Sequence, residues 1–202
     1  MYFGASLRSV IQATSMTSVF NATVHVLSAA LQERDNYTRH HCDRVAAFSD
    51  SLAQYLGVSE EEREALRMAA QFHDIGKIGI PDQVLLKPGP LTPEERLVIE
   101  THAEIGERIF RATEHPLISR VAPLIRHHHE SFNGAGYPDR LAGVAIPTMA
   151  RVLAVADAYD ALTTVRPYRT ALPLPKVLDI LAAERGQRYD PVVVDALTRI
   201  VG

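Results

Sequence analysis

Cysteine is almost absent from this sequence, since Cys42 is the single cysteine in 202 residues. One thiol excludes an internal disulfide and a metal site built from several thiolates, and it is compatible with a reducing cytoplasm, where we expect the protein to reside. Positive charge is not in surplus either, because the formal net charge is −3. That balance gives no reason to expect binding to nucleic acid polymers or to anionic membranes, so an anionic ligand would need cations placed locally.

Long apolar runs are also missing. Residues 1–31 are moderately apolar, but polar residues interrupt them at Arg8, Gln12, Asn21 and His25. No stretch reaches about eighteen apolar residues, and no basic start leads into an apolar core with a small-residue cleavage site. The sequence therefore predicts neither a membrane span nor a signal peptide.

Helical signals dominate the remainder, and no segment shows the convincing alternation of a strand. Ser59 and Thr92 each begin a pattern with glutamate three residues later, which is typical of a helix N-terminus. We expect further helices at residues 34–56, 116–129, 147–162 and 174–185 and from Pro191 onwards. Because no linker divides the chain, we predict an all-α bundle over residues 33–202. Residues 1–32 would form a helical segment packing on this domain or leading into it, and they could equally supply a homodimer surface.

Residues 71–80 read Gln-Phe-His-Asp-Ile-Gly-Lys-Ile-Gly-Ile and place an imidazole, a carboxylate and an ammonium in an otherwise apolar run. Burying such groups unpaired costs several kcal/mol each by rough estimate, so core packing does not explain them. A bound metal ion would remove this difficulty.

Histidines recur about once per expected helix, and a carboxylate follows the apolar run 152–156. The residues concerned are His41, His73, His102, the run His127–His129, and Asp157. One ligand per helix is how a bundle builds a metal site in its core. Imidazole and carboxylate without thiolate suit Fe, Mn, Ni, Zn or Co, and an aspartate could bridge two ions. Each bound imidazole needs an acceptor for its second N–H, for which Glu130 and Asp160 are candidates.

Several motifs, in order and at similar spacings, resemble the HD-GYP domains, a branch of the HD superfamily of metal-dependent phosphohydrolases. The resemblance covers the chain from about residue 33 onwards and rests on residues 73–81, 87–92, 128–130 with 134–138, and 157–163 leading to 166–169. It implies an all-helical fold and phosphodiesterase activity that acts on cyclic di-GMP. We expect this activity to open cyclic di-GMP to linear pGpG, with further cleavage to GMP left open.

The resemblance also implies roles for individual residues. The implied metal ligands are His41, His73, Asp74, His102, His128, His129 and Asp157. Asp74 and Lys77 would be catalytic, and substrate would be bound by Lys77, Gly136, Tyr137, Arg166 and Arg169. Some family members hold a third metal through a glutamate where this chain has Tyr37, so we expect two divalent ions, Fe or Mn before Ni, Co or Zn.

Two alternatives stay open. The chain could be an HD phosphohydrolase of other nucleotides, or a weakly active module that signals through partners such as diguanylate cyclase (GGDEF) domains. The Gly-Tyr-Pro loop at 136–138 and the Arg-Pro-Tyr-Arg segment at 166–169 favour the cyclic di-GMP phosphodiesterase. Structural roles also remain open for some of these residues, because Arg166 could pair with Asp160 and Tyr137 could pack under its own loop.

Overall fold

The computed structural model describes residues 26, 39–165 and 170–202. The chain divides into two compact units, Met1–Arg39 and His40–Gly202, and almost all of the first lies outside the described residues. The helical segment expected at residues 1–32 therefore stays a prediction. Tyr37, Arg166 and Arg169 also lie outside the described residues.

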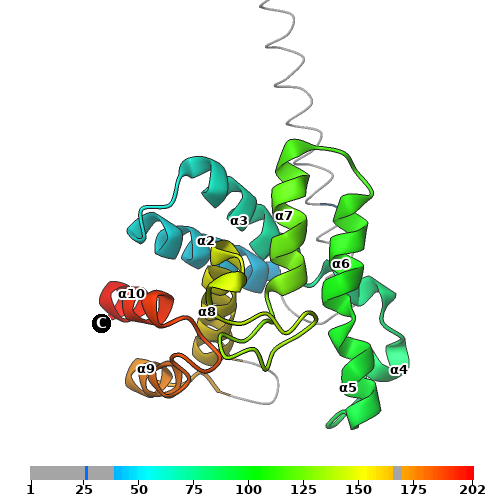
Figure 1. Ribbon diagram of the computed structural model, residues 1–202. Helices are drawn as coiled ribbons and strands as arrows, with labels where there is room; N and C mark the ends of the chain where they lie inside the picture. Colours follow the sequence, from blue (N-terminus) through cyan, green and yellow to red (C-terminus); the bar gives the residue numbers. More distant parts are fainter. Residues whose placement is uncertain (1–25, 27–38, 166–169) are drawn as a thin grey trace, which may run out of the picture. The chain divides into compact units, whose positions relative to one another are not determined.

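The described part of the second unit is helical, as the sequence predicts (Figure 1). Its elements are α2 (Arg39–Tyr55), α3 (Glu60–Phe72), η1 (Ile75–Gly79), α4 (Asp82–Leu85), α5 (Pro93–Glu100), α6 (His102–Arg111), α7 (Pro116–His127), η2 (Gly143–Ala145), α8 (Thr148–Thr163), α9 (Leu174–Ala183) and α10 (Pro191–Val201). Two isolated bridges are the only β pairing among the described residues. None of the helices searched in that part is long and apolar enough to cross a membrane.

Side-chain caps set the starts of several helices where the sequence indicates them. The Thr92 hydroxyl accepts from Glu95 N at 3.3 Å, and the Glu95 carboxylate accepts from Thr92 N at 2.8 Å, which completes a capping box at α5. Ser59 and Asp190 cap α3 and α10 in the same sense. The sequence did not reveal the break at Thr101, where α5 ends and α6 begins without an intervening proline or glycine.

The core forms where α3 meets α7 and α8, with α6 packed on α7 and on η1 (Figure 1). Leu66, Ile125 and Leu153 are fully buried there. The contact between η1 and α6 requires Gly76, because a Cβ at that position would lie 1.8 Å from the carbonyl oxygen of His102. This close approach brings the His-Asp pair just before η1 next to the first residue of α6.

An ion-pair group joins α2 to α3. Arg63 Nη2 donates to Asp50 Oδ2 at 2.7 Å, and Arg67 Nη1 donates to Asp50 Oδ1 at 2.6 Å. Helix α2 carries His41 near its start, and α3 ends directly before His73. The ion pairs therefore help to fix two histidine-bearing helices relative to each other.

Candidate metal centre

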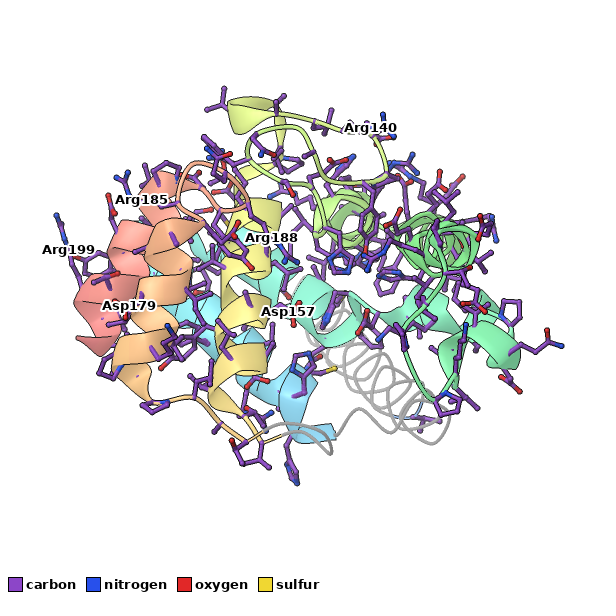
Figure 2. All side chains as sticks on the ribbon, turned by 90° about the horizontal axis from the view of Figure 1, so that it is seen from below. Arg140, Asp157, Asp179, Arg185, Arg188 and Arg199 are labelled. Atoms are coloured by element: carbon purple, nitrogen blue, oxygen red, sulfur yellow. The ribbon has the colours of Figure 1, made fainter. Side chains whose placement is uncertain are left out.

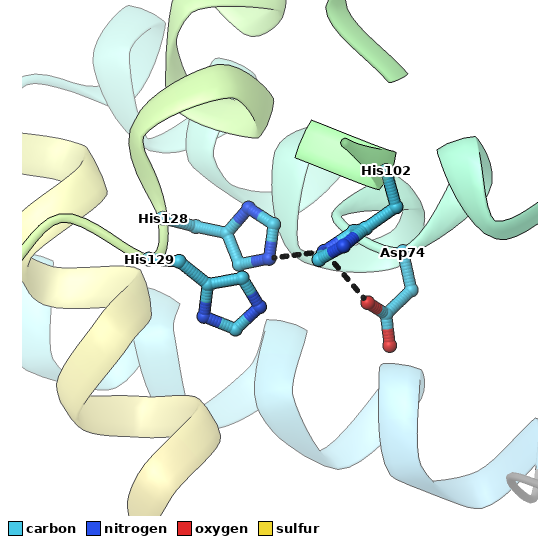
Figure 3. A group of neighbouring side chains, drawn as sticks. All are labelled: Asp74, His102, His128 and His129. Carbon is cyan, nitrogen blue, oxygen red and sulfur yellow. Dashed lines mark hydrogen bonds and ion pairs between the residues drawn. The ribbon is translucent and has the colours of Figure 1, made fainter. Parts of the chain in front are cut away.

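The residues predicted as metal ligands gather into two groups. Asp74, His102, His128 and His129 form the first group, which Figure 3 draws, and His41, His73 and Asp157 form the second. Within each group the residues offer one ligand atom each, and these atoms lie within 4.8 Å of one another. The groups combine side chains from α2, α6 and α8 with residues just after α3 and α7.

The ends of helices orient three of the imidazole rings. The last four carbonyl groups of an α-helix have no partner within the helix. Three histidines at such ends donate Nδ1–H to a carbonyl three residues earlier: His73 to Ala70 at 2.8 Å, His102 to Ile99 at 2.7 Å, and His128 to Ile125 at 2.7 Å. This assignment of the ring protons leaves each Nε2 as a lone-pair donor.

Two of these lone pairs face each other. His102 Nε2 lies 3.4 Å from His128 Nε2 (Figure 3). Burial lowers the pKa of both rings, and for His128 the neighbouring His129 lowers it further, to well below its usual range. Since both rings are then neutral and neither Nε2 carries a proton, the contact is repulsive unless a cation lies between the nitrogens. The donor set therefore fits a bound metal ion.

Asp74 faces both groups. Its Oδ1 is 3.5 Å from His102 Nε2, and its Oδ2 is 3.4 Å from His73 Nε2. Burial alone would raise the pKa of this carboxyl, but Lys77, whose Nζ is 2.9 Å from Oδ2, and then the histidines hold it well below its usual range. Asp74 is therefore an ionised carboxylate, with one oxygen directed to each group.

His41 is held by a side chain rather than by a carbonyl. Its Nδ1–H donates to Asp160 Oδ2 at 2.6 Å, and its Nε2 lies 3.4 Å from Asp157 Oδ1. Arg44 donates from Nε to Asp160 Oδ1 at 2.5 Å and from Nη2 to Oδ2 at 3.0 Å. Burial opposes ionisation of Asp160, but these bonds from His41 and Arg44 lower its pKa. Helix α8 thus supplies two carboxylates three residues apart, one on each side of the same ring.

The expectation that Glu130 accepts from a ligand histidine is wrong. Its carboxylate accepts from the backbone N–H groups of Asp139, at 2.8 Å, and Leu141, at 3.1 Å. Those groups belong to the connection between α7 and α8, and a buried backbone N–H needs a partner. The same connection requires glycine at position 136, where a Cβ would lie 2.2 Å from Ser131 N. Glu130 and Gly136 therefore shape the loop.

Tyr137 lies against the first group. Its ring centroid is 4.8 Å from that of His129 and 6.3 Å from that of His102. Burial raises the pKa of its phenol above the usual range, and the charges of Glu100 and Asp74 raise it further. The loop that the family resemblance assigns to substrate therefore borders the candidate metal centre.

Two other polar residues beside the ligands have different surroundings. His127 Nε2 lies 2.8 Å from Asp139, which also binds Arg126, so this histidine points away from the two groups. Cys42 is partly buried, and burial followed by the charge of Asp74 raises the pKa of its thiol to about 12. A thiol that resists ionisation is a poor metal ligand.

The structure adds a cation that the sequence did not single out. Arg188 lies in the connection between α9 and α10, and Figure 2 labels it there, whereas Asp179 lies on α9 and Arg199 on α10. Burial and nearby charges, among them Arg188, lower the pKa of His129. Its neighbours, Gly-Gln before and Tyr-Asp after, form no recognisable motif, so only the fold could reveal it.

Comparisons with known proteins agree with this geometry. A family model described as "HD domain" matches residues 25–193. The chain is 44% identical over 177 residues to the cyclic di-GMP phosphodiesterase response regulator RpfG of Xanthomonas campestris, covering 88% of this chain and 47% of that protein. It is 34% identical over 174 residues to 3′3′-cGAMP-specific phosphodiesterase 2 of Vibrio cholerae, covering 86% of this chain and 33% of that protein. The chain thus spans half or less of these relatives.

A solved structure supports the fold. Bd1817, described as an HDG"Y"P protein from Bdellovibrio bacteriovorus, matches with a TM-score of 0.63 at 23% identity, over 80% of this chain and 51% of that one. At this identity the likeness concerns the fold alone.

Proposed function

Because the chain belongs to the HD-domain family and is of the HD-GYP type, we propose that it is a metal-dependent phosphodiesterase that hydrolyses cyclic di-GMP to pGpG, with further cleavage to GMP left open. One observation carries the metal dependence: within the group that contains Asp74, two unprotonated imidazole nitrogens face each other at 3.4 Å. The second group adjoins it, since Asp74 Oδ2 lies 3.4 Å from His73 Nε2. The choice of substrate is supported by the name of the relative from Xanthomonas and by the Gly-Tyr-Pro loop beside the ligands.

Each ligand group would hold one divalent ion, and Asp74 would be available to both because one of its oxygens is directed to each group. The imidazole and carboxylate donors suit Fe or Mn first, with Ni, Co and Zn as alternatives. When bound, such ions activate water as a nucleophile and stabilise negative charge on a phosphate.

The chain's own residues would position the phosphodiester. Hydrolysis joins a water oxygen to phosphorus, breaks the bond from phosphorus to the ribose 3′ oxygen, and leaves a proton on that oxygen. Lys77 and Arg188 would donate hydrogen bonds where negative charge grows on the phosphate. Arg166 and Arg169, assigned to phosphate from the resemblance, would act with them. The protein has a net negative charge, but these cations would create a positive potential at the site that attracts an anionic substrate.

An anaerobic assay on metal-replete protein tests the proposal. We expect chromatography to show loss of cyclic di-GMP and appearance of pGpG, and Asp74→Ala should abolish turnover and lower the metal content. Anaerobic handling matters because an oxidised iron site would resemble an inactive protein. Full turnover by Asp74→Ala at parental metal content would refute the assigned site.

The relative from Vibrio cholerae supports a second candidate substrate, 3′3′-cGAMP. Parallel reactions with cyclic di-GMP, 3′3′-cGAMP and a panel of nucleoside mono- and triphosphates separate the candidates by kcat/KM. A nucleotide from the panel that outperforms both cyclic dinucleotides would instead make the chain an HD phosphohydrolase of other nucleotides.

A further inference from the structure

A pocket of about 400 Å³ lies beside the candidate metal centre. The end of α5 and the start of α6 form one wall, and residues 134–138 with Arg140 form the other. Tyr137 connects the pocket to the metal centre, because it lines the pocket while its ring is 4.8 Å from that of His129. Glu100, on the opposite wall, comes two residues before His102. A ligand at the metal centre could therefore extend into this pocket.

Glu100 places a carboxylate in the pocket that no described residue binds. Within the part of the chain that the structure describes, its side chain makes no hydrogen bond or ion pair. Glu104, one turn further along the same wall, differs because its Oε1 lies 3.4 Å from Arg126 Nη2. The charge of Glu100 also contributes, after burial, to the raised pKa of Tyr137, so the carboxylate acts on the ring that faces the metal ligands.

The remaining lining suits a flat, partly apolar ligand with polar edges. The apolar side chain of Leu97, which lines the pocket, is 68% exposed. Tyr137 and Pro138 add the faces of two rings. Nucleic acid bases stack on such side chains. Arg140 lines the same pocket and carries the guanidinium that is the commonest partner of guanine O6 and N7. Figure 2 shows Arg140 on the loop between α7 and α8, which forms the wall opposite Glu100.

We propose that this pocket binds a guanine base of the substrate and that Glu100 selects it by accepting hydrogen bonds from guanine N1–H and the 2-amino group. The inference rests on the proposed function, which supplies a cyclic dinucleotide at the metal centre. Guanine offers two adjacent donors on that edge and two acceptors, O6 and N7, for Arg140. Adenine places the lone pair of N1 against the carboxylate and offers no 2-amino group, so it leaves Glu100 without a matching partner.

One occupied pocket requires one guanine per substrate. Cyclic di-GMP and 3′3′-cGAMP both meet this requirement, whereas cyclic di-AMP does not. Glu100 is therefore a specificity residue for the base, separate from the residues that hold metal or phosphate.

Glu100→Gln tests the assignment with almost no change in side-chain size. A glutamine amide offers one donor and one acceptor, which match the N1 and 6-amino groups of adenine better than the two donors of guanine. We expect the ratio of kcat/KM for cyclic di-GMP over cyclic di-AMP to fall by about 10- to 100-fold, as for the loss of a hydrogen bond to a charged group. The metal content should stay unchanged. Glu64→Gln is the matched control, because Glu64 is an exposed glutamate of α3 outside the pocket.

The outcomes separate this inference from the proposed function. A parental chain that turns over cyclic di-GMP, with the same substrate ratio in Glu100→Gln as in Glu64→Gln, overturns the guanine assignment and leaves the phosphodiesterase intact. A metal-replete parental chain without cyclic di-GMP hydrolysis overturns the proposed function instead. Equilibrium dialysis with GMP and AMP then tests the pocket without turnover. A preference for GMP that is lost in Glu100→Gln supports the assignment, and equal binding of GMP and AMP by the parental chain refutes it.

Discussion

Replacing Asp160 by alanine removes the carboxylate that holds the Nδ1–H of His41 at 2.6 Å. The ring would then lose the bond that fixes its orientation towards Asp157, while the other ligand group keeps all its contacts. Removing such a partner of a metal-bound histidine weakens metal affinity by about 10- to 100-fold, which corresponds to about 1.4–2.7 kcal/mol. We therefore expect one ion to bind to Asp160→Ala as it does to the parental chain and the other to bind more weakly by that factor.

The measurement is a titration of metal-free protein with Mn²⁺ or Zn²⁺ in competition with a chromophoric chelator, together with metal analysis after dialysis. Asp160→Asn should restore part of the loss, since the amide oxygen still accepts from His41. Arg44→Ala should have a smaller effect, because the His41–Asp160 bond remains and the Arg44 side chain is 40% exposed. Asp179→Ala, on the exposed face of α9, is the matched control (Figure 2). Unchanged affinities for both ions in a folded Asp160→Ala protein would refute the reasoning.

Three further predictions concern substrate, packing and pH. Arg188→Ala should raise KM for cyclic di-GMP about tenfold, through loss of a charge-assisted hydrogen bond, with unchanged metal content; loss of metal would place Arg188 among the structural residues. Gly76→Ala should lower stability by about 1–3 kcal/mol in urea unfolding and reduce bound metal, because the new Cβ meets the carbonyl of His102. Asp50→Asn should cost about 1 kcal/mol at pH 7. Arg63 chiefly lowers the pKa of Asp50 below its usual 3.8, so this contribution is complete above that pH and is lost as the pH falls through the folded pKa. A difference between Asp50→Asn and parent that does not diminish as the pH falls below 3.8 would contradict this assignment.

The fold was predictable where short-range chemistry determines it. Thr92 and Glu95 lie three residues apart, and their capping box forms between neighbours in sequence. The division of α5 from α6 at Thr101 was not predictable in this way, since both flanks have helical patterns. Packing of η1 against the start of α6 depends on contacts that the local sequence does not encode.

The candidate site was likewise predictable only in part. That these residues gather together was predictable because charged groups in apolar segments indicate a common site, as Asp157 does after the run 152–156. Their outer partners were predicted less well. Asp160 binds His41 as expected, whereas Glu130 binds the backbone of a loop. Arg188 was missed because its proximity to His129 arises only when the connection between α9 and α10 reaches the centre of the fold.

The way in which the histidines are oriented limits how this site can change in evolution or by engineering. The rings of His73, His102 and His128 donate hydrogen bonds to carbonyl groups of the main chain. A substitution of the residue that carries such a carbonyl changes its side chain and leaves the carbonyl in place. His41 is oriented by the Asp160 side chain, which a single amino-acid substitution removes. Variation in metal preference among descendants of this chain should therefore accumulate on the face shared by α2 and α8, while the main chain keeps the orientations of His73, His102 and His128.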